Sequence, residues 1–121
     1  MRWLLIAVSI AVIQPLRPAD ASLPQGASPF TGMSFTPVFS NSLVSVTRAR
    51  MEVGAREAFH THAADTVVVH LSGGAIEDTA DGKTVVNRWK PGDVEFEARG
   101  SSHSARNINR PVDVVLVALH P

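Results

Sequence analysis

Turn dipeptides separate short runs of β-branched and apolar residues along most of this chain. Gly73-Gly74, Asp81-Gly82 and Pro91-Gly92 are pairs that favour tight turns between strands. The runs that favour strands are 43–51, 66–71, 84–89, 93–96 and 112–119. No stretch after residue 21 carries the apolar repeat of an amphipathic helix. Short strands at this spacing predict an all-β fold, an antiparallel sandwich or barrel.

The first 21 residues have the pattern of a secretory signal rather than of a folded element. Met1-Arg2 gives a positive start, residues 3–13 are almost entirely apolar, and Ala19-Asp20-Ala21 is a small-residue cleavage site. The apolar run is shorter than the roughly 20 residues of a spanning helix. We therefore expect a secreted or periplasmic protein with no stable membrane span after cleavage. An uncleaved amphipathic anchor is the alternative.

Residues 22–42 are rich in serine, proline and glycine, which predicts an extended arm with one short strand near 33–39. Three of the five phenylalanines lie in this arm. Such an apolar segment is expected to dock, either on its own barrel or on a neighbouring chain. The expected organisation is a signal peptide over 1–21, the arm over 22–42 and a β-barrel over 43–121, in a homodimer.

Composition excludes some partners and some means of stabilisation. The chain has 11 basic and 11 acidic residues, and its basic side chains are scattered, so no nucleic-acid partner is expected. It has no cysteine, so disulfides cannot stabilise the fold outside the cell. After cleavage the chain would have about 100 residues, for which a single hydrophobic core can suffice with a small stability margin. A bound metal or a partner subunit would add to it.

The histidines are the residues with the clearest chemistry. His60 and His62 stand two apart, so on a strand their imidazoles share one face. His103 follows a predicted strand and turn. Imidazoles bind transition metals at about 2.1 Å, and three converging rings can hold one ion. These residues predict a metal site made of His60, His62 and His103.

The spacing around these histidines resembles the two motifs of the cupins, G-x5-H-x-H-x3/4-E-x6-G and G-x5-P-x-G-x2-H-x3-N. The first motif corresponds to Gly54, His60, His62, Thr66 and Gly73, and the second to Gly92, Ala98, Gly100, His103 and Asn107. The match covers 54–107 without a gap. The resemblance implies a small double-stranded β-helix, the cupin or jelly-roll barrel of two antiparallel sheets. Its remaining strands would be 43–51 and 112–119.

The chain departs from each motif at one position. Ala98 replaces a turn proline, and Thr66 replaces the glutamate that supplies a carboxylate ligand in the family. Asp65 is adjacent, but strand alternation points it away unless the strand starts one residue later. The resemblance therefore implies a centre of three histidines for one divalent transition metal ion. Iron, zinc, manganese, nickel and copper all accept imidazole ligands.

Two further positions are candidates for the pocket wall. Thr66 and His70 share one strand face, so both would face the barrel interior. For His70, a hydrogen-bonded core histidine is favoured over a substrate contact. Arg48, Arg50 and Glu52 are expected on a solvent face. Glu95 and Glu97 are also expected to point outward, with Phe96 between them pointing inward.

Two functions are compatible with these residues. One is a metal-dependent enzyme, of dioxygenase or lyase/isomerase type, acting on a small and acidic organic molecule. The other is a non-catalytic module that holds a small ligand without a required metal. The absence of tyrosine weakens a likeness to thiol dioxygenases, and Thr66 weakens one to oxalate-type and flavonol-type cupin enzymes. The sequence assigns no catalytic residue.

Overall fold

The computed structural model describes residues 28–121, so the predicted signal peptide and the first residues of the arm lie outside the described part. Residues 28–121 form strands and no helix, and hence no helix that could cross a membrane. The all-β prediction is confirmed. The strands are β1 (Phe30–Ser40), β2 (Val44–Thr61), β3 (Thr66–His70), β4 (Gly74–Ala80), β5 (Lys83–Trp89), β6 (Val94–Glu97), β7 (Ser102–Asn107) and β8 (Val112–Leu119).

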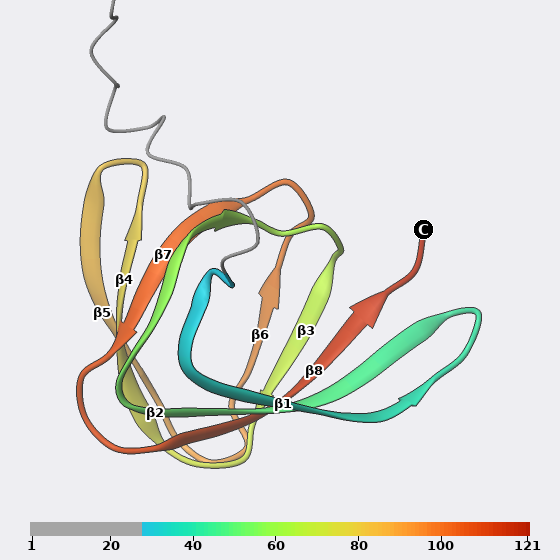
Figure 1. Ribbon diagram of the computed structural model, residues 1–121, viewed down its shortest axis with the longest axis horizontal. Coiled ribbons are helices and arrows are strands. Elements are labelled where there is room, and N and C mark those ends of the chain that lie inside the picture. Colours follow the sequence, from blue (N-terminus) through green and yellow to red (C-terminus); the bar gives the residue numbers. More distant parts are fainter. Residues whose placement is uncertain (1–27) are drawn as a thin grey trace, which may run out of the picture.

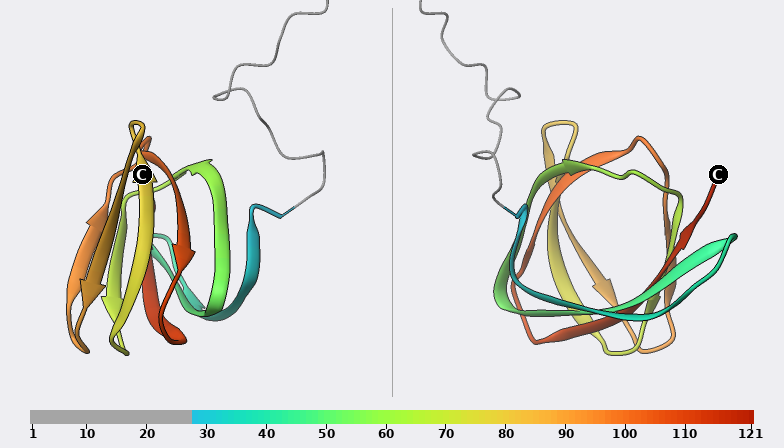
Figure 2. Two further views of the ribbon diagram at one scale, coloured as in Figure 1. Left: turned by 90° about the vertical axis from the view of Figure 1, so that its left-hand side faces the viewer. Right: turned by 45° about the vertical axis from the view of Figure 1, so that its right-hand side comes forward.

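The strands form one continuous antiparallel sheet that curls into a barrel (Figures 1 and 2). Their order is β5-β4-β7-β2-β8-β3-β6, and β1 pairs with β2. The long strand β2 joins the two halves of the barrel, because residues 44–51 pair with β8 and residues 56–61 pair with β7. Gly54 lies between these halves with a φ of 78°, a conformation that favours glycine, so β2 bends there without ending.

Three sequence expectations about strands were wrong. The strand expected over 43–51 continues to Thr61 across the bend at Gly54. No strand was expected over 74–80 or 102–107, yet these residues form β4 and β7. Both segments are rich in polar residues and alanine, which have modest strand propensity, and pairing with each other and with β2 and β5 overrides that preference.

The arm lies against the barrel of its own chain. Strand β1 pairs with β2 over nearly its whole length, and the β1–β2 hairpin extends past the barrel wall (Figure 1). Asn41 shapes the hairpin turn, because its Oδ1 accepts hydrogen bonds from the backbone N–H groups of Leu43 and Val44 at 2.8 and 2.9 Å. The expected short strand over 33–39 is therefore part of a longer strand.

The apolar core is small and lies where β2, β4, β7 and β8 meet. Its buried members are Met51, Ala55, Ile76, Ala105 and Val112. Gly74 passes so close to Val112 that a Cβ at this position would lie 2.5 Å from the valine Cγ2. Because the buried side chains are mostly small, the rest of the barrel interior remains a cavity.

Asn107 provides the main polar link within this core. Its side chain is 1% exposed, and its Nδ2 donates toward the carbonyl oxygens of Met51, Glu52 and Arg110 at 2.9, 3.1 and 2.7 Å. Its Oδ1 accepts a hydrogen bond from the backbone N–H of Asn109. The residue thus joins the end of β7 to the middle of β2 and to the turn before β8.

Candidate metal centre

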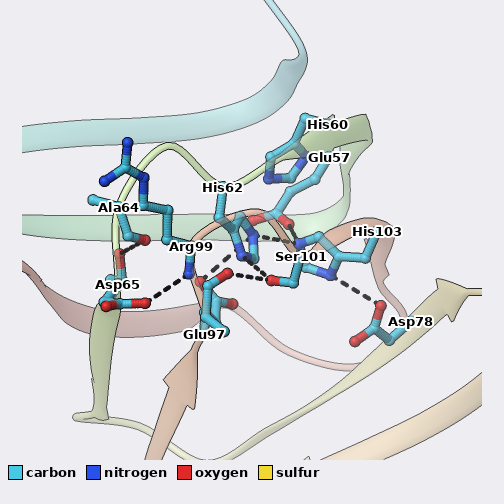
Figure 3. A network of polar contacts seen from close by, with 12 residues as sticks. Glu57, His60, His62, Ala64, Asp65, Asp78, Glu97, Arg99, Ser101 and His103 are labelled. Atoms are coloured by element: carbon cyan, nitrogen blue, oxygen red, sulfur yellow. Dashed lines mark hydrogen bonds and ion pairs between the residues drawn. The ribbon is translucent and has the colours of Figure 1, made fainter.

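The structure brings the three predicted histidines together at one end of the barrel (Figure 3). His60 lies at the end of β2, His62 follows the last residue of that strand, and His103 lies opposite His60 on β7. One ring nitrogen from each lies within 4.8 Å of the other two. The Nε2 atoms of His62 and His103 are 3.1 Å apart. An ion bonded to two imidazoles at about 2.1 Å each holds their nitrogens at about this separation.

Each of the three rings is fixed through its Nδ1 atom. His60 Nδ1 lies 2.8 Å from the carbonyl oxygen of Ala58, and His62 Nδ1 lies 3.0 Å from the hydroxyl of Ser101. His103 Nδ1 lies 3.0 Å from a carboxylate oxygen of Asp78. Metal-binding histidines are commonly oriented by such a bond to the second nitrogen, which leaves Nε2 as the ligand atom. The donor set therefore fits a transition metal ion.

Carboxylates surround the histidines, although Thr66 replaces the glutamate of the family motif. Glu57 Oε2 lies 3.3 Å from His103 Nε2, and Glu97 Oε2 lies 3.7 Å from His62 Nε2. Glu97 stands directly opposite Thr66 on the neighbouring strand β6. A carboxylate therefore reaches the same part of the barrel from the strand next to the altered position.

The expectation that Glu95 and Glu97 point outward was wrong. Both side chains line the barrel cavity, and Phe96 between them is 60% exposed. The prediction assumed that the aromatic residue Phe96 points into the barrel. Because side chains alternate strictly along a strand, that choice inverts the whole set.

Sequence reasoning missed Glu57 and Asp78 as well. Glu57 stands three positions before His60, which on a regular strand puts the two on opposite faces. The β2–β7 pairing shifts between them, since residues 57–60 of β2 span three steps while residues 103–105 of β7 span two. This bulge turns both side chains toward the cavity. Asp78 lies on β4, where no strand was expected.

The electrostatics of the centre differ from residue to residue. Hydrogen bonding to Glu57, with added attraction from Asp78, raises the pKa of His103 to about 9 against the opposing effect of burial. Burial, together with the positive charges of His103 and His60, lowers the pKa of His62. The raised pKa of His103 favours its protonated form at neutral pH, and the Nε2–H of that form faces both Glu57 Oε2 and His62 Nε2. A metal ion must displace that proton.

Burial, with repulsion from Glu95 and Glu57, raises the pKa of Glu97 from 4.5 to about 7. The folded chain thus binds more protons than the unfolded chain between these values, so this group lowers stability as pH rises through them. Glu97→Gln is expected to stabilise the metal-free protein at pH 8 by about 1–2 kcal/mol. At pH 4 the gain should vanish.

Urea unfolding in the presence of a chelator at pH 4 and pH 8 measures this difference. Glu52→Gln is a matched control, because Glu52 is exposed on the outer face and its substitution should give no such gain between the two pH values. An equal effect of Glu97→Gln at both pH values would contradict the raised pKa.

A cavity of about 510 Å³ extends from the three histidines into the barrel. Thr66 and His70 both line it, as do Glu57, Asp78, Glu95 and Glu97. Among residues 28–121, no lysine or arginine lines this cavity. The hydroxyl of Thr66 donates to the carbonyl oxygen of Ala64. The wall is otherwise largely apolar.

The remaining candidate residues lie away from the cavity lining. Arg50 pairs with Glu52 and Asp113 at 2.7 and 2.8 Å on the outer face of the sheet, as expected. Asp65 accepts a hydrogen bond from the backbone N–H of Arg99 at 2.8 Å and so holds the loop before β7 (Figure 3). Neither residue reaches the metal centre.

Comparison with known proteins identifies the fold. No protein-family model and no curated protein matches the sequence. A cupin domain from Bordetella pertussis Tohama I is similar in structure, with a TM-score of 0.68, 23% identity, and coverage of 78% of this chain and 98% of that one.

Two further solved structures agree. A cupin-like protein from Thermotoga maritima has a TM-score of 0.62 at 19% identity, over 74% of this chain and 70% of that one. KdgF from a Halomonas species has a TM-score of 0.59 at 20% identity, over 73% and 78%. Identity at this level establishes architecture rather than activity. Residues 28–121 of this chain have the cupin fold.

Proposed function

We propose that this protein binds one divalent transition metal ion through His60, His62 and His103, and holds a small organic molecule in the adjoining cavity. The observation that carries the proposal is that each ring has its Nδ1 engaged while one nitrogen of each ring lies within 4.8 Å of the other two. Three imidazoles suit iron, zinc, manganese, nickel or copper better than hard cations, which prefer oxygen.

The charges around the cavity indicate how an acidic molecule would bind. Its lining among residues 28–121 contains four carboxylates and no lysine or arginine. A bound metal ion would therefore be the main positive charge, and an acidic or other oxygen-bearing group would bind next to it. When bound, such an ion supplies Lewis-acid polarisation of an oxygen or activation of a water molecule. The apolar wall accommodates the rest of the molecule.

Elemental analysis of the purified full chain tests the proposal. The chain is stripped with a chelator, reloaded separately with zinc, manganese, iron, nickel or copper, and dialysed. We expect one ion per chain for at least one of these metals, and no retention of calcium or magnesium in the parallel samples. Failure to retain any of the five transition metals would overturn the proposal.

A further inference from the structure

The outer surface of the barrel carries a row of apolar side chains that crosses five adjacent strands. Val68 and Leu116 line the cavity, so their neighbours Val67 and Val117 point outward by strand alternation. Cross-strand pairing places these two valines in one row with a residue from each of β6, β2 and β1. The members of this row are Phe96, Val67, Val117, Val46 and Phe39.

Apolar side chains also flank this row on both sides. They are Val94, Val69 and Val115 on one side and Val44 and Leu119 on the other, and together with the row they form the outer apolar face. Phe96 and Phe39 are 60% and 55% exposed, so each ring leaves roughly 100 Å² uncovered. With the eight aliphatic side chains the face reaches the size that marks an interaction site rather than an ordinary monomer surface.

The barrel interior does not provide the apolar burial that this outer surface lacks. Among residues 28–121, four of the eight buried apolar residues are alanine. The chain also has no cysteine that could form a disulfide. A small domain with so little buried apolar surface has a narrow stability margin. A cover on the outer apolar face would therefore be a permanent part of the fold, and it requires a partner present in equal amount with every chain.

The charges along the border of this face favour a second copy of the chain over a charged partner. All ten residues of the face are uncharged. On its border Arg48 is exposed, and Arg50 is already paired with Asp113 and Glu52 at 2.8 and 2.7 Å. The chain as a whole has a formal net charge of zero at pH 7, so two copies do not repel one another.

The position of β8 makes the face compatible with twofold symmetry. This strand is the middle one of the five, with β2 and β1 on one side and β3 and β6 on the other (Figure 1). Apolar side chains extend from Val117 in both directions and end in an aromatic ring on each side. A rotation about an axis along β8 therefore places the face against itself, as an isologous interface requires.

We propose that two copies of this chain pack sheet against sheet through the outer apolar face, about a twofold axis along β8. Side chains of two such sheets interdigitate, and Phe39 of one copy meets Phe96 of the other. The contact also covers β6, which among residues 28–121 pairs only with β3 and carries Glu97 into the cavity. The second copy thereby steadies the strand that places Glu97 beside the metal centre.

Light scattering on the purified full chain at micromolar concentration tests the proposal, and we expect twice the mass of one chain. Val117→Asp places a charge at the centre of the face and should weaken the dimer at least about 100-fold. Val86→Asp is the matched control, because Val86 is exposed on β5 outside the face, and this variant should remain dimeric. A monomeric unmodified chain would overturn the inference, as would a dimer that survives Val117→Asp.

A thiol-protection measurement decides the question even if Val117→Asp does not fold. Phe96 and Phe59 are both 60% exposed, so Phe96→Cys and Phe59→Cys each give a chain with a single, comparably exposed thiol. In the metal-free dimer we expect the thiol of Phe96→Cys to react with Ellman's reagent at least about tenfold more slowly, and the difference to vanish on dilution to monomer. Loss of the dimer in Phe96→Cys alone would place the contact at the same residue.

Equal reaction rates of the two thiols in a dimeric sample would overturn the inference, because the copies would then meet through another face. Neither light scattering nor thiol protection depends on metal binding. A failure of this inference is therefore distinguishable from a failure of the proposed metal site.

Discussion

Replacing both His60 and His62 by alanine is expected to lower the affinity of the chain for a divalent transition metal by at least about 1,000-fold, because losing even one outer partner of a ligand costs about 10–100-fold. The double variant removes two of the three converging imidazoles and leaves only His103. That residue is held by Glu57 and Asp78, which favour its protonated form. A single protonated imidazole does not bind a metal ion.

Competition with a chromophoric chelator measures the affinity of both proteins for the same metal. His120→Ala is the matched control, because His120 lies near the hairpin with its Nε2 2.8 Å from the hydroxyl of Ser45. This control should bind metal like the unmodified chain. Circular dichroism checks that the double variant keeps its β-structure, as expected for side chains at the end of a strand. Metal binding that survived the double substitution would place the ion elsewhere.

The strands that could be predicted from the sequence are those with an apolar or β-branched signature. The expected runs 66–71, 84–89 and 112–119 coincide closely with β3, β5 and β8. Strands β4 and β7 lack this signature, because, apart from Ile76, the positions that line the cavity carry small or polar groups, namely Asp78, His103 and Ala105. The polar and small residues that form the site therefore also make these two strands difficult to predict from the sequence.

The candidate metal centre also combines residues that a local spacing predicts with residues that only the pairing of distant strands brings in. The spacing of His60 and His62 is a property of one strand, and the motif placed His103 with them. The carboxylates depend on features that spacing does not contain. Glu57 faces the cavity only because of a bulge in β2, and Glu97 only because the polar face of β6 is the inner one. Both follow from pairing between strands distant in sequence.

Asn107 has a structural role that the motif by itself does not explain. The motif contains an asparagine at this position, but spacing alone gives no reason for it. In the structure its amide is directed at three carbonyl oxygens, from two residues of β2 and one in the turn before β8. These carbonyls lie at the bend of β2 and beside the turn, where the ladder bonding of the sheet is interrupted. Only a side chain with two N–H donors satisfies several of them at once.

Asn107→Ala is therefore expected to lower the free energy of unfolding by about 3 kcal/mol, since it removes these hydrogen bonds and leaves buried carbonyls without a donor. Urea unfolding of the metal-free chain measures the change. Asn109→Ala is the control, because Asn109 is exposed and the structure records only its backbone N–H bonding to Asn107. Asn107→Asp keeps the shape but loses the donors, so it should destabilise at least as much as alanine. If Asn107→Ala behaved like Asn109→Ala, the link between β7 and the bend of β2 would not stabilise the barrel.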